Sequence, residues 1–411
     1  MNVVVVDWDV AYPADSGKRL RTLNLMLELA GRHNITYFTR GSGDSQQGRL
    51  AAEFLNDRGI RAVFADAPIP AKKGWQFYAR VAASMASKTP YAVAAHESAK
   101  FRGQLAAFAA ENPVDLWQLE WSAYVGMLAH LPQARTLLMA HNVDSLIWQR
   151  YAETESRRWA GWYLAGQWRR FVEYERQAFR QASHVVAVSQ DDAQLMRADF
   201  QADHVDVVEN GVDLSMFTTQ TAARDPRELL FVGSLDWRPN LDGVEWFLEA
   251  VLPLVRAAEP DARLTVVGRR PPAPLAARLR QTPNCSCHAD VPDVRPYLAQ
   301  AGIMVVPLRI GGGSRLKILE AAAAGLPVAS TTVGAEGLRF QAGRDLTIAD
   351  DPRHLAAAIV QWIQDPGAAR QCAERAREVV DEYYGWNRVA GDLERVWEKV
   401  ATARVAAPRV R

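Results

Sequence analysis

Short runs of consecutive apolar residues alternate along the chain with longer segments whose apolar positions recur at helical spacing. The first run, Asn2–Asp7, precedes a helical pattern over 17–32, and the same order begins again at 228–234 and 240–258. Further strands are predicted at 34–39, 61–65, 115–120, 136–140, 184–189, 262–268 and 303–308. This alternation is typical of parallel sheets with helices on both faces. We therefore expect an α/β fold of two doubly wound, Rossmann-like domains that face each other across a cleft.

A polar, turn-forming segment over 209–228 separates the two halves of this pattern and is the best candidate for a domain boundary. A last helical pattern follows the second half. This helix either stays with the second domain or crosses back to the first. The predicted division is 1–212 for the N-terminal domain, 213–227 for the linker, 228–380 for the C-terminal domain, 381–402 for the C-terminal helix and 403–411 for a frayed tail.

Composition narrows the function classes. The net charge of +1 over 411 residues gives no overall attraction for nucleic acid. Cys285, Cys287 and Cys372 are too few for a disulfide framework, and Cys285, Cys287 and His288 lack the usual zinc-ligand spacing. The start MNVVVVDWDV is expected to be a strand rather than a signal peptide. No window approaches about 18 consecutive apolar residues. We expect reduced thiols and a cytoplasmic protein.

A glycine-rich loop opens the segment GGGSRLKILEAAAAGLPVAS, which begins at Gly311. Ser314 is a suitable N-cap, and the helix after it is expected to end at Gly325. Its first turn carries Arg315 and Lys317, where the helix dipole favours acidic residues. Backbone donors and two cations at a helix N-terminus suit a multiply charged anion. The alternative is a flexible loop with two solvated cations.

The spacing of these glycines matches neither the P-loop nor the Rossmann fingerprint, which disfavours an ATPase or an NAD enzyme. Glu320 lies three residues after Lys317, on roughly the same face of the predicted helix. Its carboxylate either pairs with Lys317 or accepts hydrogen bonds from both hydroxyls of a ribose. A site that binds phosphates through cations and a ribose through a carboxylate is a nucleotide site.

Several stretches resemble the retaining, GT-B-fold nucleotide-sugar glycosyltransferases of family 4, in particular the bacterial branch that builds exopolysaccharide and lipopolysaccharide. They follow the family order over nearly the whole chain. These stretches are YPADSGKRLRTLNLMLELA, AHNVDSLIWQR, VVENGVDLSMF, LLFVGSLDWRPNLDGVEWF, LTVVGR, VPDVRPYLAQAGIMVVPLRIGGGSRLKILEAAAAGLPVAST and GAEGL.

The resemblance implies that the C-terminal domain binds the donor, with the diphosphate at the glycine loop and the ribose on Glu320. The turn at Gly17 would close over the phosphates, and His141 would contact the sugar near the reacting carbon; the alternative for His141 is a buried structural histidine. The implied donor-binding residues are Gly17, Gly233, Ser234, Asn240, Gly311, Gly312, Gly313, Ser314, Arg315, Lys317 and Glu320. The implied catalytic residues are His141, Arg315 and Lys317.

The chain departs from the family pattern at three positions. Gly312 stands where members with Glu-x7-Glu have their first glutamate. Ser234 and Asn240 stand where many members have an arginine and a lysine for the phosphates. We infer that Arg315 and Lys317 supply the missing charge from the other side of the pocket.

Asp7 and Asp9 form an Asp-x-Asp pattern, which in other glycosyltransferases holds Mn²⁺. If cations already neutralise the diphosphate, a metal is unnecessary. We expect no metal and no cofactor, and we interpret Asp7 and Asp9 as structural or acceptor-facing.

Residues 147–171 contain four of the chain's 13 tryptophans, interspersed with arginines. Aromatic and basic residues on one amphipathic segment suit a membrane interface. The alternative is a helix buried against the N-terminal domain, with its tryptophans in the core.

The resulting hypothesis is a metal-independent retaining hexosyltransferase that moves a sugar from a nucleoside diphosphate sugar to a hydroxyl of a glycan or lipid-linked glycan, on the inner face of the membrane. The alternatives are a nucleotide-sugar epimerase or phosphorylase of the same fold, and a catalytically inactive nucleotide-sugar-binding relative.

Overall fold

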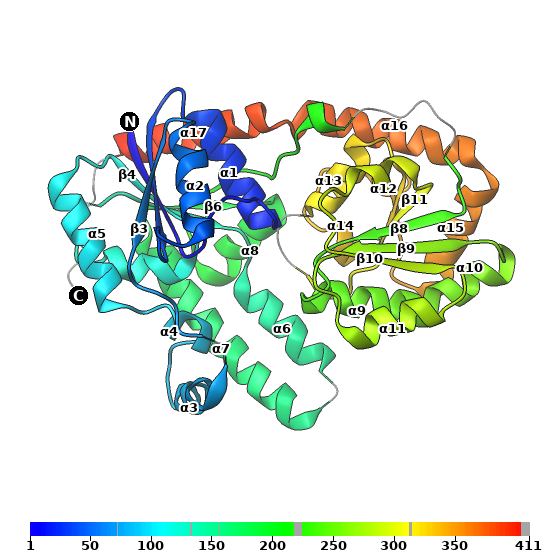
Figure 1. The fold of residues 1–411 in the computed structure, drawn as a ribbon, viewed down its shortest axis with the longest axis horizontal. Helices are drawn as coiled ribbons and strands as arrows, with labels where there is room; N and C mark the ends of the chain where they lie inside the picture. The colour runs from blue at the N-terminus through cyan, green and yellow to red at the C-terminus, as the bar shows by residue number, and fades with distance from the viewer. Residues whose placement is uncertain (72, 132–133, 156, 218–223, 312–314, 404–411) are drawn as a thin grey trace. The chain divides into compact units, whose positions relative to one another are not determined.

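The computed structural model describes residues 1–411 except 72, 132–133, 156, 218–223, 312–314 and 404–411. The chain forms two compact units (Figure 1). Unit 1 comprises Met1–Glu209 together with the chain from Asn387 onward, and unit 2 comprises Asn210–Trp386.

Unit 1 is built on a parallel sheet of seven strands in the order β3-β2-β1-β4-β5-β6-β7. Val3–Val6 of the central strand β1 are at most 2% exposed, because helices cover both faces of a parallel sheet and its strands are apolar throughout. The strands are β1 (Asn2–Asp7), β2 (Asn34–Arg40), β3 (Ile60–Ala65), β4 (Leu116–Leu119), β5 (Thr136–Ala140), β6 (His184–Ala187) and β7 (Val205–Val207).

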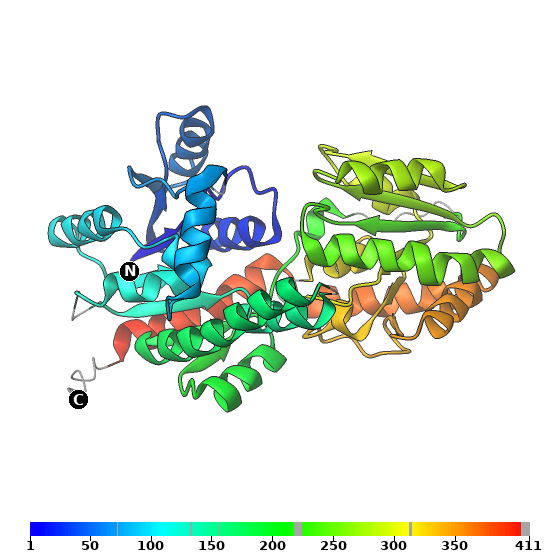
Figure 2. The ribbon, with the colours of Figure 1, turned by 90° about the horizontal axis from the view of Figure 1, so that it is seen from below.

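The helices of unit 1 lie on both sides of this sheet, as Figure 2 shows. They are α1 (Gly17–Leu29), α2 (Gln46–Asn56), α3 (Gly74–Met85), α4 (Tyr91–Ala94), α5 (Ala99–Glu111), the 3₁₀ segment Ser122–Leu128, α6 (Asp144–Thr154), α7 (Arg158–Gln181), α8 (Gln190–Phe200) and α17 (Trp386–Thr402).

The last helix belongs mainly to unit 1, although the rest of the second half does not. Trp397 of α17 is 1% exposed, and its Nε1 donates a hydrogen bond of 2.8 Å to Gln118 Oε1 in β4. The helix predicted over 381–402 is wrong at its start, because residues 381–383 end α16 (Pro366–Tyr383). The chain leaves helical geometry at Tyr384, whose carbonyl accepts a hydrogen bond of 2.7 Å from Val212 N–H.

Unit 2 has a parallel sheet of six strands in the order β10-β9-β8-β11-β12-β13. Its strands are β8 (Glu228–Val232), β9 (Arg263–Gly268), β10 (Cys285–Ala289), β11 (Ile303–Val306), β12 (Val328–Ser330) and β13 (Thr347–Ile348). Its helices are the 3₁₀ turn Leu214–Met216, α9 (Arg238–Trp246), α10 (Leu252–Ala258), α11 (Ala273–Gln281), α12 (Arg295–Gln300), α13 (Leu316–Ala323), α14 (Thr332–Ala335), α15 (Pro352–Gln364) and α16.

The structure confirms the predicted doubly wound α/β class and each predicted strand. The helix predicted over 240–258 is divided into α9 and α10 by a π-helical turn over Phe247–Val251. The strands that the pattern missed, β7, β10, β12 and β13, are short or, in β10, lack an apolar run.

Candidate functional site

The glycine loop leads into α13, but the helix starts later than predicted. Arg315, not Ser314, is the N-cap, with a left-handed backbone of φ 40° and ψ 25°. This conformation keeps Arg315 out of the helix, so that of the two cations only Lys317 lies in the first turn. Gly312, Gly313 and Ser314 lie outside the described residues. The predicted end is confirmed, because Gly325 takes the positive φ of 66° that follows many helices.

Arg315 has a carboxylate partner within unit 2. Its side chain is 5% exposed, and Nη2 lies 3.1 Å from Glu336 Oε2. A Cβ at Gly311 would lie 2.9 Å from Nη1 of the same side chain, so the guanidinium lies directly against the backbone of Gly311. Arg315 therefore stabilises the loop as well as adding positive charge to it.

Lys317 joins the start of α13 to the start of α9. Its Nζ lies 2.7 Å from Asn240 Oδ1 and 4.5 Å from the centre of the Phe231 ring. Asn240 is 3% exposed, and its Nδ2 donates a hydrogen bond of 2.8 Å to the carbonyl of Ser234. A Cβ at Gly233 would lie 2.9 Å from Lys317 Nζ. The structure thus brings Gly233, Ser234, Asn240 and Lys317 together at the carboxyl end of β8.

Arg269 is a cation of this cluster that the sequence interpretation missed. It directly follows β9, and its Nη2 donates a hydrogen bond of 2.9 Å to Ser234 Oγ. Because β9 pairs with β8 in parallel, the residue after β9 lies beside the residues after β8. The signal was present, since an arginine at the carboxyl end of a neighbouring strand belongs to the same edge.

Lys317 and Glu320 have strongly shifted pKa values. Burial lowers the pKa of Lys317 to about 7, with a further contribution from the charge of Arg315. Burial also raises the pKa of Glu320 to about 7, against the opposing charge of Lys317. The described structure contains no ion pair between them, because Lys317 is directed toward Asn240. The alternative that Glu320 only neutralises Lys317 is therefore disfavoured, and its carboxylate can still accept hydrogen bonds.

In unit 1, His141 directly follows β5 and pairs with Glu120 directly after β4. His141 Nε2 lies 2.8 Å from Glu120 Oε2. Glu120 is 1% exposed, and it also accepts hydrogen bonds from Thr22 Oγ1 and, over 2.6 Å, from Gln118 Nε2. Glu120 was missed, although a glutamate at the end of a predicted apolar strand was a usable signal.

This pairing fixes the protonation of the histidine. Burial lowers the pKa of His141, and the pairing with Glu120 opposes that effect only in part. Burial opposes ionisation of Glu120, but His141, Lys18 and Thr22 together bring its pKa down to about 2. A carboxylate only accepts hydrogen bonds, so the neutral ring carries its proton on Nε2 and presents Nδ1 as an acceptor.

Asp7 and Asp9 each have a cationic partner from α1. Lys18 Nζ forms an ion pair with Asp7 Oδ1, and Arg19 contacts both oxygens of Asp9 at 2.7 and 2.9 Å. Asp7 also accepts a hydrogen bond of 3.0 Å from the Tyr37 hydroxyl. These contacts favour the structural interpretation of both aspartates. Gly17 opens α1 in the same region, and its predicted approach to the donor stays a prediction.

The tryptophan-rich segment spans two helices, α6 and α7. Trp148 stacks on Phe171 with ring centres 5.6 Å apart, as the core alternative requires. Trp159 and Trp162 are instead 71% and 69% exposed. Trp148 thus packs against the core with its side chain partly buried, whereas the core interpretation is wrong for the two tryptophans at the start of α7. Within the described residues, no helix is long and apolar enough to cross a membrane.

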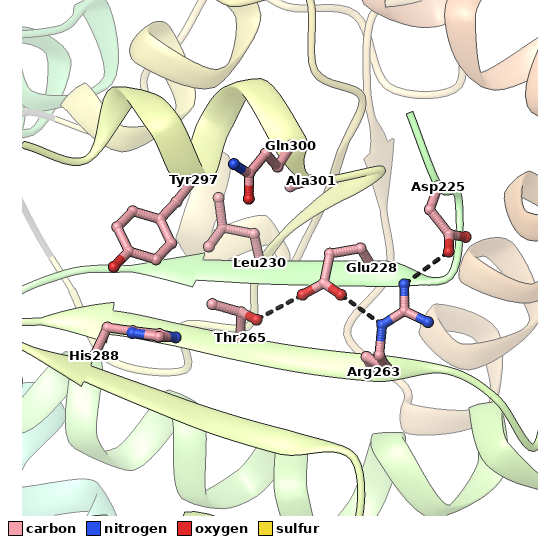
Figure 3. Close-up of a pocket in the computed structure, with 9 residues that line it drawn as sticks. All are labelled: Asp225, Glu228, Leu230, Arg263, Thr265, His288, Tyr297, Gln300 and Ala301. Atoms are coloured by element: carbon pink, nitrogen blue, oxygen red, sulfur yellow. Dashed lines mark hydrogen bonds and ion pairs between the residues drawn. The ribbon is translucent and has the colours of Figure 1, made fainter. Parts of the chain in front are cut away.

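A cavity of about 360 Å³ in unit 2 has none of the predicted donor-binding residues in its lining (Figure 3). Glu228 accepts hydrogen bonds from Thr265 Oγ1 and, over 2.8 Å, from Arg263 Nε, which is also bound through its Nη2 to Asp225. These four polar groups of the cavity wall satisfy one another.

Comparisons with known proteins bear on the family and the fold of the chain. Residues 17–216 match the family described as Glycosyltransferase Family 4, and residues 226–365 match Glycosyl transferases group 1. The chain is 29% identical over 270 residues to MMP alpha-(1->4)-mannosyltransferase of Mycolicibacterium hassiacum, covering 63% of this chain and 64% of that enzyme. It spans 44% and 48% of the length of two further curated relatives.

Solved structures show the same fold. Sucrose-phosphate synthase from Thermosynechococcus elongatus superimposes with a TM-score of 0.71 at 18% identity, covering 97% of this chain and 98% of that one. Anabaena HepE in complex with UDP and glucose superimposes with a TM-score of 0.65 at 13% identity, covering 97% and 100%. The fold is therefore the GT-B fold of nucleotide-sugar glycosyltransferases. Within that class, the chain belongs to the family 4 type.

Proposed function

We propose that the protein transfers a sugar from a nucleoside diphosphate sugar to a hydroxyl of a glycan or lipid-linked glycan, with retention of anomeric configuration. The observation that carries the proposal is the lysine of the glycine-loop helix, Lys317, held among Gly233, Ser234 and Asn240 at the end of β8. The binding of UDP and of UDP-glucose by HepE, a protein of the same fold, supports a nucleotide sugar as the donor.

The proposed clamp for the diphosphate consists of Lys317, Arg315, Arg269 and the N-terminus of α13. Preorganised cations stabilise negative charge that develops on a leaving group without reorganising during the reaction. We assign the carboxyl of Glu320, one turn further along α13, to the ribose hydroxyls, from which it would accept hydrogen bonds. Because this clamp is already cationic, neither a metal nor another cofactor is part of the proposal.

The proposed role of His141 follows from its tautomer. With the Nε2 proton donated to Glu120, Nδ1 can accept a hydrogen bond from a hydroxyl of the donor sugar. The bond between the anomeric carbon and the β-phosphate oxygen breaks, and the acceptor oxygen bonds to the same carbon on the same face. The departing phosphate oxygen takes the acceptor proton. Gly17 belongs to this proposal as the turn that approaches the phosphates.

A lipid-linked acceptor would require contact with the inner face of a membrane, so the proposed location is cytoplasmic with peripheral membrane contact. The exposed tryptophans of α7 are the candidates for that contact.

An assay with a panel of nucleotide sugars tests the proposal. Thermal shift first identifies the donor, because a ligand that binds the native state raises its stability. Turnover is then followed with and without glycan acceptors, and NMR of the product gives its anomeric configuration. Conversion without an acceptor would instead support an epimerase, and a requirement for inorganic phosphate would support a phosphorylase. Binding without any turnover would support an inactive relative.

A further inference from the structure

Two helices of unit 1 expose large aromatic side chains that play no part in the proposed chemistry. On α3, Trp75 and Tyr78 are 76% and 69% exposed. On α7, Trp159 and Trp162 are 71% and 69% exposed. Large apolar groups gathered on a surface commonly mark a binding site.

The exposed residues of α3 form a stripe along one side of the helix. Trp75, Tyr78 and Met85 are separated by three and seven residues, so they lie on one face, and Met85 is 45% exposed. The other side of α3 packs on the protein, since Ser84 is 5% exposed and the Phe77 ring lies 5.8 Å from that of Tyr91. One side of α3 thus packs on the protein, and its outer side carries an exposed apolar stripe.

Hydrogen bonds attach the end of α3 and the start of α4 to the middle of α7 (Figure 1). Arg170 Nη2 donates a bond of 2.7 Å to the carbonyl of Met85, the last residue of α3. Tyr91 N–H donates a bond of 3.0 Å to Gln167 Oε1, a side chain of α7 that is fully buried. We name Trp75, Tyr78, Met85, Trp159 and Trp162 the aromatic face.

The segments that carry the aromatic face are basic. Between Asp66 and Glu97 the sequence has four basic residues and no acidic one, and between Glu155 and Glu173 it has four arginines and no acidic residue. The whole chain has a net charge of only +1, so positive charge is concentrated where the exposed aromatics are. The exposed cations of these segments are Lys73, Lys88, Arg157, Arg158 and Arg169, of which Arg157 forms an ion pair of 3.0 Å with Glu155.

We propose that the aromatic face docks on the surface of an anionic lipid bilayer. Tryptophan and tyrosine rings favour the level of the lipid headgroups, while arginine and lysine attract anionic lipids. A second copy of the chain is disfavoured as the occupant, because it would bring two sets of the same basic segments together. This inference rests on the membrane contact of the proposed function and deepens it, because it adds α3 to the tryptophan segment that the sequence singled out. Vesicle binding is measured without donor or acceptor, so its failure is distinguishable from a failure of sugar transfer.

The test is flotation of the full-length protein with vesicles of phosphatidylcholine alone or mixed with phosphatidylglycerol, without donor or acceptor. Three variants are compared: Trp75→Ser/Tyr78→Ser on α3, Trp159→Ser/Trp162→Ser on α7, and a control, Leu50→Ser/Leu254→Ser. The control residues are 46% and 40% exposed and lie on α2 and α10. Circular dichroism checks that the variants melt like the wild type.

We expect the wild type to bind only the anionic vesicles, and each aromatic double variant to lose about tenfold or more in partitioning. Arg158→Glu should weaken binding at least about fivefold, since one basic residue near an anionic surface contributes roughly that factor. The control should bind like the wild type.

Equal binding to neutral vesicles, or no binding at all, would overturn the proposal. So would wild-type binding by the α3 variant. Concentration-dependent dimerisation that the aromatic variants abolish would identify a second copy as the occupant instead.

Discussion

Lys317 Nζ donates a hydrogen bond of 2.7 Å to Asn240 Oδ1, across 77 residues of sequence. The family resemblance implies a lysine where Asn240 stands, and in this chain Lys317 of α13 contacts that asparagine. Arg269 similarly reaches Ser234, which stands where the resemblance places an arginine. Ser234 and Asn240, the two departures from the family pattern after β8, are thus each contacted by a cation from a neighbouring element.

Replacing Lys317 should separate catalysis from folding. In Lys317→Met we expect kcat to fall by the equivalent of about 2.7–4 kcal/mol, the cost of removing one donor that stabilises developing negative charge. The apo protein should melt no lower than the wild type, because burial of Lys317 disfavours its charged form. The folded pKa of about 7 lies below the usual lysine value of 10.5. Any gain in stability of Lys317→Met over the wild type should therefore be largest at or below pH 7 and shrink as the pH rises.

Arg315→Gln is the matched contrast. It removes the ion pair with Glu336 from a side chain that is 5% exposed, so it should lower the melting temperature as well as kcat. Calorimetry and steady-state kinetics on both variants check this pair of expectations. Marked destabilisation by Lys317→Met with normal kcat would show that Lys317 is structural.

Binding of a nucleoside diphosphate should be accompanied by proton uptake. In the apo protein Lys317 has a pKa of about 7, and a phosphate beside it would raise that pKa. Affinity should therefore weaken as the pH rises above 7, where the apo lysine is increasingly neutral. Isothermal titration at pH 8 in buffers of different ionisation enthalpy measures the uptake, and Lys317→Met should reduce it; the same uptake in wild type and variant would speak against the assignment.

Glu120 should act as a positioning residue for His141. In Glu120→Gln the carboxylate that holds the Nε2 proton is lost, and misplacement of a catalytic group can cost about 10²-fold in kcat. Nitrogen-15 NMR of the His141 ring provides a readout besides activity, since we expect the Nε2-protonated tautomer in the wild type and its loss in the variant. Thr22→Val removes one donor to Glu120 but leaves the carboxylate, so its tautomer should match the wild type. An unchanged tautomer in Glu120→Gln would contradict the proposed role.

Turnover should survive metal removal. Asp7 and Asp9 are engaged by Lys18 and Arg19, and the proposed clamp already supplies positive charge to the diphosphate. The measurement is the rate before and after EDTA treatment, with Mn²⁺ or Mg²⁺ added back. If EDTA abolishes the rate and Mn²⁺ restores it, the expectation is wrong, and Asp7 and Asp9 become candidate metal ligands.

The pattern of apolar residues was sufficient to predict the strands that position the site, because parallel strands buried on both faces are continuous apolar runs. It could not reveal partners that the sheet order brings together. Glu120 and His141 each follow a strand, and they meet because β4 and β5 are neighbours. Arg269 and Ser234 meet for the same reason. The start of α13 was misplaced because Arg315 takes a left-handed backbone and is itself the N-cap, which the sequence pattern does not reveal.

The central claim, that the cluster around Lys317 binds the donor diphosphate, is tested most directly by titrating UDP, with GDP and ADP as alternatives, into the wild type, Lys317→Met and Glu320→Ala at pH 7. The account predicts that at least one of these nucleotides binds the wild type, and that both variants weaken that binding about tenfold or more. Lys317→Met removes a cation from the diphosphate, and Glu320→Ala removes the carboxyl that accepts the ribose hydroxyls. Wild-type affinity in both variants would contradict it.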